Sequence, residues 1–230
     1  MKKLMIAAAM MVASMSASAQ FEAGTFSLQP KLGVGVSWLS NMPNLPLSAT
    51  GVYSKDIDKS PIAAASVGVE AEYQVASRFS LAAGVNYSLQ GSGWKDTDIA
   101  IEGFQVVKLT DAKVELGYVN VPVTANLYIF KNFAVKAGVQ FGFLTNASVK
   151  CSAENTDIKT KVDTDVDMMD DCDKFDISIP MGISYQFKVP IVLDLRYNLG
   201  LKKVNKDSEP GLKDFKNNSV MLTVGYKFAL

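Results

Sequence analysis

The sequence predicts an all-β fold, an eight-stranded antiparallel transmembrane β-barrel with up-and-down meander topology. Three observations lead to it. Apolar and polar residues alternate over long stretches, these stretches are joined by links that are alternately short and long, and the polar face is rich in Gly and Ser. Period-two alternation is typical of a strand whose two faces meet different surroundings. Short turns at one end and long loops at the other are typical of membrane barrels.

The alternating stretches are long enough for the roughly 9–11 residues that a tilted membrane-spanning strand needs. The eight predicted strands are 26–40, 63–76, 79–90, 113–130, 133–150, 174–188, 191–204 and 218–230. Short links fall at 77–78, 131–132 and 189–190, and long links at 41–62, 91–112, 151–173 and 205–217. An even number of strands places both termini in the periplasm. The alternative is a soluble lipocalin-like or sandwich fold with the apolar face inside.

Aromatic residues of the apolar face gather toward strand ends, as in the two interfacial girdles of membrane barrels. The periplasmic girdle is predicted to contain Phe26, Phe79, Phe130, Phe133, Phe187 and Phe228. The outer girdle is predicted to contain Trp38, Tyr87, Tyr118, Phe143, Phe175 and Tyr197.

The first residues have the three-part layout of a secretory signal peptide. Lys2 and Lys3 precede an apolar run over 4–13, and Ala17-Ser18-Ala19 forms a small-residue cleavage site. A membrane anchor is the alternative, but the run is too short to span a hydrocarbon core of about 30 Å. We therefore expect a signal peptide at 1–19, a barrel domain at 20–230, and export to the cell outer membrane of a Gram-negative cell.

Charge and composition exclude several functions. The chain has 23 basic and 23 acidic residues; without the two signal lysines the balance is 21 − 23 = −2, which gives no basis for nucleic-acid binding. Histidine is absent. Ser-His-Asp hydrolases, Cys-His proteases and His-ligated zinc sites are therefore excluded. We expect no enzymatic activity and no cofactor.

The polar face carries charged residues that alternation places inside the barrel. They are Lys31, Glu70, Glu72, Lys136, Asp194, Arg196 and Lys227. An eight-stranded barrel is just wide enough to be filled by side chains, and opposite charges buried there should pair because an unpaired buried charge is costly. We interpret the set as an ion-pair network that fills the lumen. A gated or narrow solute path is the alternative.

The long link 151–173 carries two further candidate sites. Cys151 and Cys172 stand at its ends, and an even cysteine count in an exported protein favours a disulfide; free buried thiols are the alternative. Asp163, Asp165 and Asp167 have the spacing of a calcium loop, whose ligands are hard oxygen atoms. Met168 replaces the glycine of that pattern, so a solvated acidic segment is the preferred interpretation and no metal site is predicted.

The last strand ends in a pattern similar to the terminal signal that the barrel-assembly machinery recognises during insertion. Its residues are Thr223, Gly225, Phe228 and Leu230. A terminal strand with no recognition role is the alternative.

These features together resemble the PorT-like outer-membrane β-barrel family of Bacteroidetes. The likeness lies in the lysine-started signal that ends in Ala-Gln, the Gly-rich first strand (31–35), the stretch Tyr118-Val119-Asn120-Val121-Pro122-Val123, and the Tyr-x-Phe end. The resemblance implies a barrel among outer-membrane lipids. One branch of the family is linked to protein secretion, and no catalytic residues come with the family.

Three functional hypotheses remain. The first is a structural or interaction role for a filled barrel, through a protein partner at its external loops or periplasmic end. The second is a small pore or transporter for small or apolar solutes, because a Gly-rich inner face leaves space. The third is an accessory role in protein secretion.

Overall fold

The computed structural model describes residues 22–42, 57–100, 106–155, 160–206 and 214–230. Its ring of strands comprises β1 Phe26–Ser40, β3 Ile62–Ala76, β4 Phe79–Trp94, β6 Val106–Phe130, β7 Phe133–Asn155, β9 Phe175–Gln186, β10 Ile191–Gly200 and β11 Lys216–Tyr226. Four short strands accompany the ring: β2 Lys59–Ser60, β5 Thr97–Ala100, β8 Thr160–Asp167 and β12 Phe228–Ala229. Within the described ranges there is no helix with the length and hydropathy required to cross a membrane. The predicted signal peptide at 1–19 lies outside the described residues.

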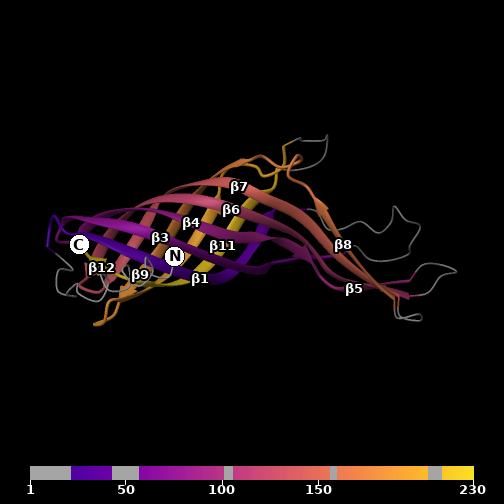
Figure 1. Cartoon of the computed structure of the whole chain (residues 1–230), viewed down its shortest axis with the longest axis horizontal. Helices are drawn as coiled ribbons and strands as arrows, with labels where there is room; N and C mark the ends of the chain where they lie inside the picture. The colour runs from indigo at the N-terminus through magenta and orange to yellow at the C-terminus, as the bar shows by residue number, and fades with distance from the viewer. Residues whose placement is uncertain (1–21, 43–56, 101–105, 156–159, 207–213) are drawn as a thin grey trace, which may run out of the picture.

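The ring closes through antiparallel pairing of its first and last strands. Each long strand pairs with its neighbours in chain order, and β1 pairs with both β3 and β11. Lys31, for example, lies opposite Gly68 on β3 and Gly225 on β11. The ring strands are strongly tilted, and β12 and the C-terminus lie at one end (Figure 1). The eight-stranded up-and-down barrel is therefore confirmed.

The two faces of the barrel show the polarity of a membrane protein. Leu32 and Val34 point outward and are 67% and 66% exposed, whereas Gln29 and Asp194 point inward and are 1% exposed. A barrel dissolved in water would bury its apolar face and expose its polar one. The lipocalin-like or sandwich alternative is therefore wrong.

Aromatic pairs lie at both ends of the apolar outer surface. Phe130 and Phe133 pack with ring centroids 6.5 Å apart at the end that carries the termini. Trp38 stacks on Tyr197 at 6.1 Å near the opposite end, which we call the distal end. Tyr118 was expected in this outer girdle, and that expectation is wrong: its side chain is 1% exposed and lies inside. The position of Tyr118 along β6 was predicted correctly, but its side chain points into the lumen, as do those of its buried neighbours on the same strand.

A second sheet extends from the ring at the distal end. Residues 106–109 of β6 pair with β5, and residues 148–155 of β7 pair with β8. We call β5, these two strand extensions and β8 the distal sheet; in Figure 1 it projects to the right of the ring. The links 91–112 and 151–173 were expected to be loops. That expectation is wrong for much of both, because β6 and β7 continue through them as strands.

Candidate functional site

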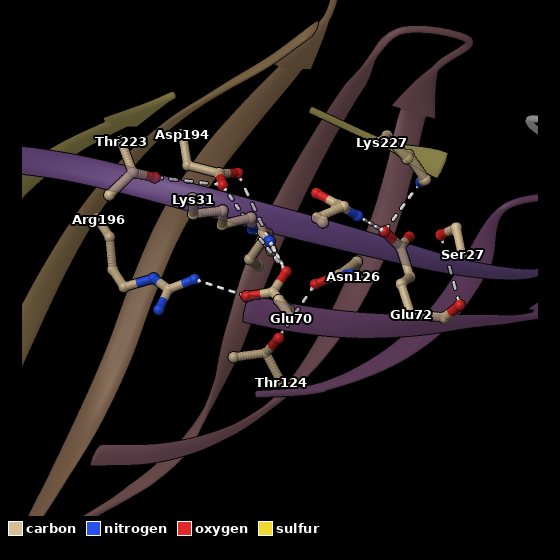
Figure 2. Close-up of polar contacts among 12 residues, drawn as sticks. Ser27, Lys31, Glu70, Glu72, Thr124, Asn126, Asp194, Arg196, Thr223 and Lys227 are labelled. Carbon is tan, nitrogen blue, oxygen red and sulfur yellow. Dashed lines mark hydrogen bonds and ion pairs between the residues drawn. The ribbon is translucent and has the colours of Figure 1, made fainter. Parts of the chain in front are cut away.

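Glu70 is the centre of a buried ion-pair network in the lumen. Lys31 Nζ lies 2.7 Å from Glu70 Oε1, Lys136 Nζ lies 2.9 Å from the same atom, and Arg196 Nη2 lies 3.1 Å from Oε2. The Glu70 side chain is 4% exposed. Three strands other than its own therefore direct a cation at one carboxylate (Figure 2).

Asp194 is a second acceptor for two of these cations. Its oxygens lie 2.8 Å from Lys31 Nζ and 3.4 Å from Lys136 Nζ. Thr223 donates its hydroxyl to Asp194 Oδ2 at 3.4 Å. These residues lie on β10, β1, β7 and β11, so the network ties strands on different sides of the ring to one another (Figure 2).

Glu72 is the centre of a neighbouring cluster nearer the termini. Lys227 Nζ lies 2.9 Å from Glu72 Oε2, and Gln29 Nε2 donates to the same oxygen at 2.8 Å. Ser80 and Tyr128 donate their hydroxyls to Oε1. All seven residues of the predicted lumen set therefore lie in two adjoining clusters, because Glu70 and Glu72 are two positions apart on β3 and share its inner face.

Inward glycines give the long side chains room. A Cβ atom at Gly225 would lie 2.9 Å from Lys31 Cγ, closer than side chains pack. The lysine stem therefore occupies the space that any larger residue at this position of β11 would need. Neighbouring side chains therefore fill part of the space that the Gly-rich inner face leaves in the lumen.

A small polar cavity lies beside the network. Its volume is about 40 Å³, and Asn86, Asn120, Gln140 and Asn198 contribute to its lining. That volume has room for about three water molecules, since one needs roughly 10–15 Å³. Asn198 Oδ1 has no hydrogen-bond partner within the described residues, and water is the natural one.

An apolar cluster fills the distal end of the lumen. Its buried members are Leu39, Met42, Leu116, Tyr118, Leu144, Ala147, Cys172 and Val204. Trp94, Val114, Met168, Met169 and Phe215 pack against them. The lumen therefore contains a charged layer, a small polar cavity and an apolar layer in sequence toward the distal end.

The predicted disulfide is not formed in this structure: Cys151 and Cys172 are both free. Cys151 is not at the base of a loop, because β7 continues through it and pairs it with Thr164 of β8. Cys172 instead joins the apolar cluster and forms an isolated antiparallel bridge with Asn205. Burial raises the pKa of the Cys172 thiol, and nearby Asp171 adds to that effect.

The three aspartates of the calcium pattern lie on one strand. Asp163, Asp165 and Asp167 alternate with Val162, Thr164 and Val166 along β8, and Ser152 donates its hydroxyl to Asp163 Oδ1 at 2.6 Å. In the described part of the chain, no three or more His, Cys, Asp or Glu residues form a group that could hold a metal ion. The choice between a solvated segment and a calcium site stays a prediction; calcium binding would raise the melting temperature in millimolar CaCl₂.

The predicted assembly signal lies at the closing seam of the barrel. Thr223 and Gly225 face the lumen on β11, and Phe228 of β12 pairs with Leu28 of β1. The amide of Leu230 donates to the Phe26 carbonyl at 2.7 Å. These residues thus help to close the ring against β1; recognition by the assembly machinery stays a prediction.

Sequence reasoning missed two features, the distal sheet and the apolar cluster. The Val-Asp alternation over 162–167 was the available signal for β8. The apolar cluster gave a weaker signal, because its members come from strand ends and links that lie far apart in the sequence.

Comparison with known proteins agrees with this architecture. The family model described as "Outer membrane protein beta-barrel domain" matches residues 17–206. No curated protein matches the chain significantly.

Solved structures with a similar fold share little sequence with this chain. Ail, the attachment invasion locus protein of Yersinia pestis, solved with the heparin analogue sucrose octasulfate, is 12% identical with a TM-score of 0.40, and the match covers 90% of this chain and 100% of Ail. Neisserial surface protein A is 13% identical with a TM-score of 0.44, covering 88% of this chain and 97% of that one. OprG from Pseudomonas aeruginosa is 10% identical with a TM-score of 0.40, covering 91% and 97%.

Proposed function

The chain belongs to the outer membrane protein β-barrel domain family, and from this premise we propose that it is a closed barrel that presents its distal sheet to a protein partner outside the cell. In this proposal a signal peptide directs export, and the termini face the periplasm. The observation that carries the proposal is the combination of a filled lumen with a sheet that extends beyond the ring.

The filled lumen argues for a structural role. Water and ions would have to pass both the Glu70 network and the apolar layer around Leu116. Opening the Glu70 network would break buried ion pairs. Removing one partner of such a pair typically costs about 3–5 kcal/mol.

The distal sheet reaches beyond the apolar surface of the barrel. Lys113, Glu115 and Lys150 form ion pairs on β6 and β7, distal to the exposed Phe143. Charged pairs of this kind belong in water or among lipid headgroups. They mark the limit of the hydrocarbon layer, and the pairing of β8 with β7 begins at the same level, where Ser148 lies opposite Asp167, and continues away from the ring.

The edge of β8 supports the choice of partner. Within the described residues β8 pairs with β7 only, so its other edge offers backbone donors and acceptors to an added strand. Val162 and Val166 are 57% and 51% exposed on one face, and Asp163 and Asp165 occupy the other. Like charges discourage pairing of two copies through this edge, whereas an extended segment carrying Lys or Arg would bring opposite charges to the acidic face. The proposed partner is therefore a basic extended segment of another protein.

Peptide binding to the refolded protein in micelles tests the edge. A fluorescent peptide of alternating Lys and Thr should bind, with amide NMR shifts confined to β8 and residues 148–155 of β7. The double change Asp163→Asn and Asp165→Asn should weaken binding, while Lys113→Gln at the ring serves as the matched control. Equal binding of an alternating Glu-Thr peptide would count decisively against the proposal.

Conductance in a planar lipid bilayer tests the closed lumen. Refolded protein whose gel migration is heat-modifiable should give no discrete current steps. Steps that change on substitution of Arg196 or Glu70 would overturn the closed-barrel proposal.

A small pore is the second candidate, and one observation favours it. The β4–β6 ladder pairs Ala83 with Val123 and Asn86 with Asn120 but skips the stretch between them, which contains Pro122. Proline has no N–H to donate. The polar cavity is lined by Pro122 at this interruption, so a path through the wall would start there. Conductance or solute uptake abolished by filling the cavity, for example with Ser88→Phe, would favour this candidate.

A further inference from the structure

Sulfur-bearing side chains are concentrated at one place in the molecule. Of the ten methionines, five lie at positions 1–15, so residues 20–230 contain five methionines and two cysteines. Met42, Met168, Met169 and Cys172 all belong to or pack against the distal apolar cluster. The other three sulfur-bearing residues lie apart from it: Met181 is on the lipid face, Met221 lines the polar cavity in the lumen, and Cys151 is in the distal sheet.

Backbone hydrogen bonds hold these residues in place. The Met168 amide donates to the Ala147 carbonyl at 2.9 Å, and the Asp171 amide donates to the Met168 carbonyl at 3.2 Å. Cys172 is fixed by its bridge to Asn205. Met42 and Cys172 are 5% and 8% exposed. The main chain at Met168 and Cys172 is therefore held by the fold; Met42 and Cys172 are buried, and Met168 and Met169 are partly buried against the cluster.

The chemistry of this set selects one class of ligand. Thiolate and thioether sulfur are soft donors that select soft ions such as Cu(I), while Mg²⁺ and Ca²⁺ require oxygen ligands. One thiolate and one monovalent ion give a neutral complex, which can lie among Leu39, Leu116 and Leu144 without a buried net charge. The Trp94 ring packs against the same cluster, so its fluorescence can report an ion bound there.

We propose that Cys172, Met42 and the Met168–Met169 pair form a binding site for a monovalent soft metal ion, Cu(I) or its analogue Ag(I), at the distal end of the barrel. On binding, the Cys172 S–H bond breaks and a sulfur–metal bond forms. The proton goes to solvent, and no electron is transferred. The site is independent of the β8 edge and of any partner bound there.

Silver titration of the reduced, refolded protein in detergent micelles tests the site. Ag(I) is the probe because it does not cycle its oxidation state in air, and native mass spectrometry gives the stoichiometry. One Ag(I) per chain should bind and alter tryptophan fluorescence through Trp94. Cu(I), delivered under a competing chelator, should give the same stoichiometry.

Matched variants separate the site from a merely reactive thiol. Cys172→Ser should weaken Ag(I) binding by more than roughly 10–100-fold, which is the loss of affinity that removing a group hydrogen-bonded to a metal ligand typically causes. Cys151→Ser should leave it unchanged. Met42→Leu conserves volume and should weaken binding, whereas Met181→Leu on the lipid face should not. If Cys172→Ser does not fold, the Met42→Leu and Met168→Leu variants carry the test.

Three results would overturn the proposal. The first is Ag(I) affinity that does not change in Met42→Leu and Met168→Leu, which would indicate a simple thiol adduct. The second is equal loss in Cys151→Ser, which would indicate a two-thiol site. The third is binding no tighter than that of the variant lacking both cysteines.

Discussion

Replacing Glu70 by Gln should destabilise the barrel far more than any single surface charge does. The substitution keeps the shape of the side chain and removes its charge. The local set of Lys31, Lys136 and Arg196 against Glu70 and Asp194 has a balance of 3 − 2 = +1. In Glu70→Gln it becomes 3 − 1 = +2, with Asp194 left as the single carboxylate among three cations.

The magnitude follows from burial. Glu70 and Asp194 side chains are 4% and 1% exposed, and those of Lys31 and Lys136 are 10% and 6% exposed. Breaking a buried pair from one side typically costs about 3–5 kcal/mol. We therefore expect the free energy of unfolding to fall by about 3–5 kcal/mol, because the Arg196 guanidinium loses its only carboxylate among the described ion pairs.

Urea unfolding in lipid vesicles, followed by tryptophan fluorescence and heat-modifiable gel migration, measures this change. Glu115→Gln is the matched control: its carboxylate pairs with Lys113 and Lys150 on the outside and is 27% exposed. Exposed pairs contribute about 0–1 kcal/mol. Combining Glu70→Gln with Arg196→Gln should recover part of the loss, since the charge balance returns to 2 − 1 = +1.

An effect of Glu70→Gln as small as that of Glu115→Gln would refute the reasoning. It would mean that water screens the network as it screens the surface. The lumen would then be hydrated throughout, and the pore would become the leading function.

Two further predictions concern single groups. Tyr118→Phe removes a buried hydroxyl that lacks a partner within the described residues, so stability should stay constant or rise by up to about 1 kcal/mol, whereas Tyr128→Phe removes a donor to the Glu72 carboxylate and should cost about 1.5–3 kcal/mol in the same urea assay; a larger loss in Tyr118→Phe would contradict this. The hydrogen bond from Lys202 holds the pKa of Asp173 below its ordinary value, so this contact stabilises the fold fully above pH about 4 and the contribution is lost as pH falls through the lowered value. NMR titration of Lys202→Met should show the Asp173 pKa moved back toward its ordinary value, and an unchanged pKa would exclude this cause.

The sequence predicted the ring strands well because each has one face in lipid. For β1 the predicted limits, 26–40, are those observed, since Leu32 and its outward neighbours alternate without interruption. The signal weakens where a strand leaves the membrane. In 162–167 both faces meet water, so polar residues alternate with exposed valines, and this short alternation is a weaker strand signal than that of the ring strands.

The candidate site was predictable in composition but not in pairing. Alternation alone assigns Glu70 and Lys136 to the inner face. Their contact depends on how far each strand is displaced along its neighbour, and this shear is set by all the ladders together. Arg196 reaches Glu70 across 126 positions of sequence for that reason. The disulfide prediction failed for a related cause, since it assumed that β7 ends before Cys151.

The seam between β1 and β11 has a consequence for the order of the chain. Leu230 donates to Phe26, and Gly24 donates to Gln74, so the two ends meet beside each other at the same rim as the turns at 77–78 and 131–132. A circle of strands has no intrinsic beginning. Joining the ends and reopening the chain at one of these turns would keep every ladder intact and make a different strand the last one exported. A circularly permuted chain would thus separate the sequence features needed for the folded barrel from those needed for its export and insertion into the membrane.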